Sequence, residues 1–453
     1  MAYNFVGVDR DQPFLLPPSV ADWLPADHLA WFVLDAVGRF DLSEFRAAYR
    51  ADGRGGAAHD PSMMVALLLY SYCTGVVSSR KIEAACQVDV AYRVVTGNLV
   101  PDHTTVSRFR ARFADRLAGL FTQILAMCAA AGLAKVGTVA LDGTKMAAPA
   151  SLGANRTKET IARQVRELLA AAEEQDAAED AEFGEGVRGD ELPAGLRGRA
   201  DRLARLEAAK ALLEAEQAAK AREHEERLAE RARKEAESGK KLRGGKPKPP
   251  GEKASEKRKK PKANTTDPES RTMSTRNGWV QGYNAQAVAD EGQVVLAAEV
   301  TQDANDQAQL HPMIAAVRAE LDAAGIGDPV KVLLADAGYC SEVNLAGLGA
   351  DGPDCYVAAR NMRHGEPRAA SRGPLPRDAS LVDRMDRKVS RKKGRALYDK
   401  RKRIVEPVFG QIKAAQGVRG FSRRGLEAAK AEWKLIAASH NLLKLYRRAV
   451  GAA

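Results

Sequence analysis

Hydrophobic positions recur at helical spacing through the first 135 residues of the chain. In 29–48 and 61–72 apolar residues follow one another every three or four positions, with Ser, Thr or Asp near the starts and Gly near the ends. We therefore predict an all-helical N-terminal region, 1–135.

Within this region, 76–114 has the outline of a helix-turn-helix. A first helix follows Ser78 or Ser79, Gly97 interrupts the chain, and a second helix opens near 102–105. That second helix carries basic residues suited to a DNA backbone, namely Arg108, Arg110 and Arg112. A small helical bundle without any DNA contact produces the same pattern, so both interpretations stay open at this point.

The pattern changes from helical to β-like and back after residue 135. The short apolar run 137–142 predicts a strand that ends on Asp142. Beyond it, 156–182 and 198–238 are rich in Ala, Glu, Lys, Arg and Leu with only a thin apolar stripe, which predicts two exposed helices in a hairpin. A Pro/Lys/Gly-rich linker, expected to be disordered, follows to about residue 263.

The remainder of the chain alternates strands with helices. A hairpin is expected over 279–302, because two β-rich runs flank the turn Asp290-Glu291-Gly292. The order then continues with a helix at 303–325, a buried strand ending at Asp336, a strand at 354–360 and helices from about 395 to the C-terminus. This order predicts an α/β core with a mixed sheet and flanking helices.

The net charge of +11 is concentrated in two segments. Residues 240–262 and 384–403 each hold 11 Lys/Arg against two acidic residues, so the rest of the chain is net negative. Concentrated cations of this kind recruit a polyanion such as DNA, although a solvated basic segment that binds nothing is equally compatible with 240–262.

Cysteine usage and hydropathy narrow the class of protein further. The five cysteines are odd in number and none are at C-x-x-C spacing, which argues against a disulfide framework and a structural zinc site. The N-terminus lacks a secretory leader pattern, and no apolar window reaches the roughly 20 residues of a membrane span. We expect a soluble, cytoplasmic protein with no membrane partner.

Two aspartates share a local pattern that suggests metal chemistry. Asp142 and Asp336 each end a buried-looking strand, and glycine follows within two residues. Ligands gather at the carboxyl ends of adjacent strands in an α/β sheet, and Mg²⁺ is the usual partner of grouped carboxylates. An aspartate at a strand end is more often a turn or cap residue, so the case rests on the group. Four further polar residues lie in ordered-looking segments near the core, and the sequence assigns them no role: Asp267, Arg271, Asp303 and Asp306.

Glu406, in the stretch RIVEPVFGQIK, is a candidate third carboxylate. Arg403 precedes it by three residues and Lys413 follows by seven, so cations suited to phosphate flank it on a helix. Pro407 fixes its own φ and lacks an N–H, which predicts a helix start or break at Glu406.

These three blocks resemble the DDE transposases of bacterial insertion sequences, in the group whose last block carries a Tyr-Arg-Glu-Lys signature. The resemblance rests on VALDGTKMAA around Asp142, LLADAGYCS around Asp336 and the terminal YDKRKRIVEPVFGQIK. The helical N-terminal region resembles the DNA-binding domain of the same group, in PSMMVALLLYSYCTG and PDHTTVSRFR.

The resemblance implies an RNase H-like core in which Asp142, Asp336 and Glu406 bind two Mg²⁺ ions, with Mn²⁺ as a substitute. It also implies cleavage at terminal inverted repeats and transfer of the 3′-OH ends into target DNA by a homodimer or larger assembly. Residues that would contact DNA phosphates are Tyr398, Arg401 and Lys413. The separation of Arg401 from Glu406 is five residues where the commoner pattern has four, so Lys402 and Arg403 are alternative phosphate contacts.

The expected organisation has four parts. A helical DNA-binding domain spans 1–135, the first core strand and its loop span 136–155, the charged helical insertion and linker span 156–263, and the rest of the core spans 264–453. Two alternatives to a transposase stay open: a stand-alone nuclease that cuts without joining, and a DNA-binding regulator or domesticated remnant without catalysis.

Overall fold

The computed structural model describes residues 19–50, 57–183, 194–238, 249, 261–276, 278–349, 352–359, 375–376 and 378–451. The predicted basic linker lies almost entirely outside these residues. Within them, no single helix has the length and apolar character of a membrane span, although the bent pair His103–Arg112 and Ala114–Ala130 meets that test when counted together.

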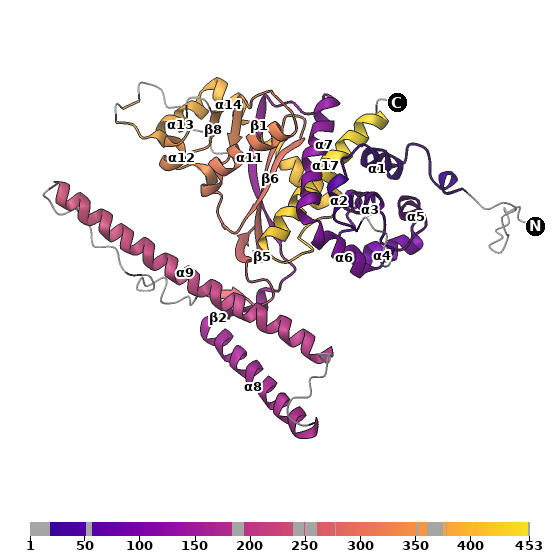
Figure 1. Cartoon of the computed structure of the whole chain (residues 1–453). Coiled ribbons are helices and arrows are strands. Elements are labelled where there is room, and N and C mark those ends of the chain that lie inside the picture. Colours follow the sequence, from indigo (N-terminus) through magenta and orange to yellow (C-terminus); the bar gives the residue numbers. More distant parts are fainter. Residues whose placement is uncertain are drawn as a thin grey trace, which may run out of the picture.

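A mixed sheet of six strands lies at the centre of the molecule (Figure 1). Its strands are β1 (Thr138–Ala147), β4 (Arg271–Thr275), β5 (Gly278–Asp290), β6 (Val295–Thr301), β7 (Val332–Ala335) and β8 (Asp354–Val357). β5 runs antiparallel to β1 and to β6, while β7 runs parallel to β1 and to β8. The order β6-β5-β1-β7-β8 therefore places β1 in the middle, and β4 pairs with the first half of β5.

The structure confirms the predicted hairpin, which is β5 and β6, and the predicted strands that became β7 and β8. The prediction that the first strand ends at Asp142 is wrong, because β1 continues to Ala147. The antiparallel ladder with β5 explains the extension: it runs from Val139 to Ala147, whereas the parallel ladder with β7 stops at Leu141.

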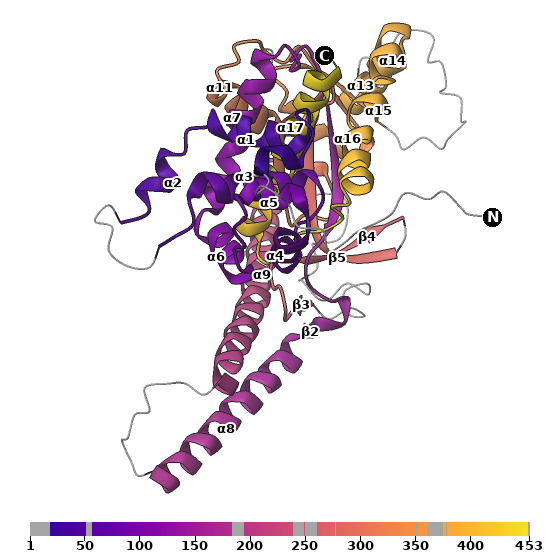
Figure 2. The same cartoon turned by 90° about the vertical axis from the view of Figure 1, so that its right-hand side faces the viewer.

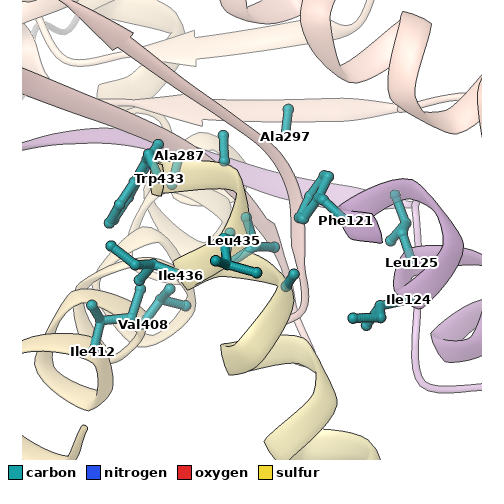
Figure 3. Close-up of a cluster of buried hydrophobic side chains, with 14 of the residues drawn as sticks. Phe121, Ile124, Leu125, Ala287, Ala297, Val408, Ile412, Trp433, Leu435 and Ile436 are labelled. Atoms are coloured by element: carbon teal, nitrogen blue, oxygen red, sulfur yellow. The ribbon is translucent and has the colours of Figure 1, made fainter. Parts of the chain in front are cut away.

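Helices cover both faces of the sheet. On the face that carries Asp142 and its ladder partner Ala287 lie α16 (Glu406–Gly410) and α17 (Leu426–Gly451), and Trp433 of α17 packs beside Ala287 (Figure 3). α11 (Leu310–Ala323) covers the other face, where it forms a cavity with Val139 and Leu333. Because side chains alternate along a strand, neighbouring residues of β1 face different helices.

Seven helices precede β1 in the described part of the chain, which agrees with the predicted helical N-terminal region. They are α1 (Leu29–Gly38), α2 (Ser43–Ala47), α3 (Pro61–Cys73), α4 (Ser79–Val88), α5 (Val90–Thr96), α6 (His103–Arg112) and α7 (Ala114–Ala130). Figure 2 shows them on one side of the sheet, with α7 and α17 running together. Buried side chains of these helices and of the sheet form one continuous core, shown around Phe121 and Ile436 in Figure 3.

The structure has three helices where the predicted helix-turn-helix outline has two. Asp89 adopts an extended backbone conformation and accepts hydrogen bonds from the N–H groups of Ala91 and Tyr92, so it caps a new helix and divides the predicted first helix into α4 and α5. The second predicted helix is α6, which Asp102 caps through the N–H groups of Thr104 and Thr105.

Two long helices, which lie between β1 and β4 in the sequence, project away from the sheet (Figure 1). They are α8 (Lys158–Phe183) and α9 (Ala194–Ser238), and a short antiparallel pair, β2 (Asn155–Thr157) with β3 (Lys262–Asn264), lies at their base. A small apolar cluster separate from the main core joins α8, α9 and β3: Ile161, Leu206, Ala209, Leu213 and Ala263. Residues 184–193 lie outside the described part of the chain, so the hairpin connection stays a prediction.

Candidate active site

Asp142 and Asp336 lie at matching positions on adjacent parallel strands. The ladder between β1 and β7 ends with Leu141 opposite Ala335, and each aspartate is the next residue along its strand. Asp142 accepts a hydrogen bond from its neighbour Gly143 N–H at 2.8 Å, and Asp336 accepts one from Gly338 N–H at 2.8 Å. The sheet therefore brings together two carboxylates that are 194 residues apart in the sequence.

Glu406 reaches the same site from a broken helix. α15 (Arg401–Ile404) and α16 (Glu406–Gly410) are separated at Val405, and Pro407 occupies the first turn of α16. The structure thus confirms the break that the proline predicted. A π-helical turn, Gln411–Ala415, follows and carries Lys413.

Arg401 links two of the three predicted catalytic carboxylates. Its guanidinium donates to Asp142 Oδ2 at 2.9 Å and to Glu406 Oε1 at 3.2 Å. The Arg401 side chain is 10% exposed, whereas that of Glu406 is 50% exposed. The five-residue spacing between Arg401 and Glu406 spans the break at Val405 and brings the guanidinium into this position. Arg401 therefore lies among the predicted catalytic carboxylates and not on the outer surface.

The other predicted phosphate contacts lie around this group. Lys413 Nζ donates to Thr144 Oγ1 at 2.6 Å and to Lys145 O at 2.9 Å, two and three residues beyond Asp142 on β1. Tyr398 ends α14 (Lys392–Tyr398) and is half-buried. The two alternative cations, Lys402 and Arg403, are exposed on α15.

Burial and neighbouring carboxylates raise the pKa values of the two aspartates. Burial raises the pKa of Asp142 to about 6; Arg401 opposes this shift and Asp336 adds to it. Burial also raises the pKa of Asp336, while the Gly338 N–H and Arg401 oppose the shift. Asp306 adds to the upward shift of the Asp336 pKa. Partly desolvated carboxylates with raised pKa values are typical of a site built to hold a cation.

The donor chemistry of this site fits Mg²⁺. Asp142, Asp336 and Glu406 offer only carboxylate oxygens, which are the ligands that Mg²⁺ prefers in proteins. Among the described residues, no three acidic, histidine or cysteine side chains already converge on one metal position. The guanidinium of Arg401 lies between Asp142 and Glu406 and accounts for their separation.

The reverse face of β1 holds a second polar group that our sequence reasoning missed. Asp306 accepts hydrogen bonds from Asn284 and Gln286 of β5 and lies 3.5 Å from Lys145 Nζ. Gly143 lies opposite Gln286 in the ladder, and Lys145 lies opposite Asn284. Only the register between β1 and β5 reveals this grouping, and no local sequence pattern fixes that register.

Arg108 and Arg110 of α6 have different environments. Arg108 is exposed, in agreement with a role in DNA binding. Arg110 is 5% exposed, and its guanidinium donates to four oxygens: Tyr72 Oη, Val77 O, Ser79 Oγ and Ser422 Oγ. A buried guanidinium with these partners has little to offer a DNA phosphate, so we withdraw the predicted contact for Arg110 and assign it to the packing of α6 against the core.

Family comparisons agree with this arrangement. A family model described as a transposase domain (DUF772) matches residues 18–112, and a family model described as a transposase DDE domain matches residues 245–442. The second match contains Asp336 and Glu406 and begins after Asp142 and the projecting helices. No curated protein and no solved structure matches the chain.

Proposed function

Since the chain belongs to the DDE transposases of insertion sequences, we propose that it cuts DNA at the terminal inverted repeats of such an element and joins the 3′-OH ends to target DNA. The observation that supports this chemistry most strongly is the matched position of Asp142 and Asp336 at the end of the parallel ladder, with Glu406 tied to Asp142 through Arg401. The strand order agrees with the RNase H-like fold that the DDE family implies.

The three carboxylates would be the metal ligands. Asp142, Asp336 and Glu406 would hold two Mg²⁺ ions, or Mn²⁺, which activate the attacking oxygen and stabilise the leaving oxygen in phosphoryl transfer. The strand ends fix the two aspartates, because each also accepts a backbone N–H from a neighbouring glycine. Glu406 is more exposed than Asp142 and would face the bound DNA.

Cations around the carboxylates would hold the DNA backbone. Arg401 neutralises Asp142 and Glu406 in the protein alone, and a DNA phosphate offers its guanidinium an alternative bidentate partner. Lys413 is anchored beside Asp142 on β1 and would contact a phosphate next to the scissile bond. Lys402 and Arg403, with half-buried Tyr398, would extend this contact along the strand.

The N-terminal helices would bind the transposon end as duplex DNA. Arg108 is exposed on α6, and Arg108→Ala is expected to weaken binding of an inverted-repeat duplex and to reduce its salt dependence. Lys234→Ala on α9 removes the same charge far from this surface and serves as the control. Action as a homodimer or larger assembly on paired ends is part of the same proposal.

Cleavage and joining assays with Asp336→Ala test the catalytic assignment. Wild-type protein with Mg²⁺ is expected to nick inverted-repeat DNA and to form covalent joints with an added target plasmid, whereas Asp336→Ala should bind the ends without either product. Nicks without joints would favour a stand-alone nuclease. Specific binding without Mg²⁺-dependent products, unaffected by Asp142→Ala, would favour a regulator.

A further inference from the structure

Asp306 lies on the face of β1 opposite the Asp142–Arg401 pair and takes no part in the proposed chemistry so far. It directly precedes the short 3-10 helix Gln307–Gln309, in the connection between β6 and α11. Its Oδ1 accepts from Asn284 Nδ2 and from Gln286 Nε2, each at 2.7 Å, and lies 3.5 Å from Lys145 Nζ. Three donors around one oxygen fix the orientation of this carboxylate.

Close approach of Asp306 to β1 requires the glycine that follows Asp142. A Cβ atom at Gly143 would lie 2.6 Å from Asp306 Oδ1 and would also overlap the side-chain amide of Gln286. Both distances are too short for a carbon atom, so any side chain at this position would push the Asp306 carboxylate away. The glycine of the Asp-Gly-Thr-Lys motif thus leaves room for Asp306 directly behind Asp142.

The same polar group also contacts the loop that carries Asp336. The Tyr339 hydroxyl donates to Gln286 Oε1, and the Tyr339 ring is fully buried. A Cβ atom at Gly338 would lie 3.0 Å from Asp336 Oδ1 and 3.6 Å from Asp306 Oδ2, so the two carboxylates flank this glycine. The Asp336 loop is therefore held from behind by β5 through the Tyr339–Gln286 hydrogen bond, and Asp306 holds the same Gln286 side chain.

Lys145 is the cation that pairs with Asp306 in this polar group. Its side chain is 18% exposed, and Asp306, Asp142 and Asp336 all act on its ammonium group. Asp306 is the one carboxylate within salt-bridge distance of Lys145 in the described part of the chain. If Asp306 lost its charge, the carboxylates still attracting the ammonium group would be Asp142 and Asp336, which are predicted to bind metal.

We infer that Asp306 is a positioning residue of the active site: it holds Lys145 and the Gln286 amide that bonds Tyr339 of the Asp336 loop, so that Asp142 and Asp336 stay available to a divalent cation. This inference rests on the proposed function, because it assigns a support to the same carboxylates. Asp306 acts through Lys145 and Gln286 and does not itself touch DNA or the reacting atoms.

Asp303 provides a matched control for Asp306. It lies three residues earlier in the same connection, is exposed, and its side chain accepts a hydrogen bond from Gln309 Nε2 at 2.8 Å. Asp303→Asn and Asp306→Asn remove the same charge from nearly the same place. A difference between the two variants therefore reports the contacts of Asp306 and not the net charge of the protein.

Mn²⁺ binding to the full-length protein, followed by electron paramagnetic resonance without DNA, tests the inference. Asp306→Asn is expected to weaken Mn²⁺ binding by about 10-fold or more, as for other residues that support metal ligands, and Asp303→Asn by less than about 2-fold. The double variant Asp306→Asn/Lys145→Met should recover most of the loss, because no ammonium group is left to compete for the aspartates.

Several outcomes would overturn the inference: equal Mn²⁺ affinity in Asp306→Asn and wild type, an equal loss in Asp303→Asn, or no recovery in the double variant. If Asp306→Asn fails to fold, Lys145→Met alone decides, because it should bind Mn²⁺ at least as tightly as wild type, and weaker binding contradicts the inference. If wild type binds Mn²⁺ but makes no DNA products, the proposed function fails while the inference about Asp306 is still decided. Absence of Mn²⁺ binding by wild type would contradict both.

Discussion

The two faces of β1 carry opposite charges in different surroundings. On one face Asp142 pairs with Arg401 beside half-exposed Glu406, and Lys413 bonds Thr144 two residues further along β1. On the other face Lys145 meets Asp306 among the amides of β5, under α11. Asp142 and Asp306 are about equally buried, with 18% and 21% of their side chains exposed, and the half-exposed carboxylate of Glu406 lies on the first face only. Strand alternation thus places Asp142 and Lys145, three residues apart in one motif, on different faces of β1.

The largest loss of activity should follow a change on the face of β1 that carries Asp142. Asp142→Asn keeps the size of the side chain but removes a predicted metal ligand, so DNA nicking with Mg²⁺ should fall by at least about a thousandfold. Single-turnover nicking of an end-labelled inverted repeat measures this loss. Asp303→Asn should stay within about twofold of wild type, and a similar loss in both variants would contradict the separation of the two faces.

Lys413 should show a smaller effect on the same face. Lys413→Met keeps the aliphatic stem and removes the ammonium group that lies beside Thr144, so nicking at saturating DNA should fall by about 10- to 100-fold. Burial lowers the pKa of Lys413, with nearby Lys145 adding to the shift, and a DNA phosphate would favour the charged form again. Nicking equal to wild type would remove Lys413 from the proposed phosphate contacts.

Gly143→Ala tests how much the close packing of Asp306 and Gln286 behind Asp142 contributes to stability. The added methyl group would collide with Asp306 and Gln286, so the free energy of unfolding should fall by about 1–3 kcal/mol. Gly137→Ala is the control, because a Cβ atom there has open space. Chemical denaturation measures both variants, and equal stability would show that the group behind Asp142 adjusts at little cost.

The pH dependence of Mn²⁺ binding should distinguish Asp142 from an ordinary carboxylate. Burial, reinforced by Asp336 and opposed by Arg401, raises the pKa of Asp142 to about 6, and only the ionised form binds metal. Below about pH 6 each pH unit should therefore weaken Mn²⁺ binding by up to about tenfold, and binding should level off above that pH. Levelling off near pH 4 would indicate an unperturbed Asp142.

The raised pKa of Asp142 also changes how the free energy of unfolding of the metal-free protein depends on pH. Because the pKa of Asp142 in the folded protein lies above its ordinary value, the buried carboxylate destabilises the fold above about pH 6, and this penalty disappears as the pH falls toward 4. A cation bound by the ionised carboxylate at neutral pH would offset this penalty.

The sequence was most informative where a pattern is local. Alternation and turn residues predicted the β5–β6 hairpin, and Pro407 predicted the break before Glu406. The strand carrying Asp142 was predicted too short, because its second half is fixed by pairing with β5, more than 130 residues away in the sequence.

Side-chain environment was the other part that the sequence could not supply. Arg108 and Arg110 look alike as basic residues of one helix, yet only the tertiary structure shows that Arg110 is buried against Tyr72. Asp303 and Asp306 look alike in the same way, and only the folded β6–α11 connection shows that Asp306 bonds Gln286 while Asp303 stays exposed.

The central claim is that Asp142, Asp336 and Glu406 form one metal-dependent active site, and the most direct test is an anomalous difference map of the DNA-bound protein with Mn²⁺. We predict two Mn²⁺ positions about 4 Å apart among the three carboxylates, with Arg401 no longer bonded to both Asp142 and Glu406. Mn²⁺ bound elsewhere, or no Mn²⁺ with Arg401 still between the two carboxylates, would contradict the claim.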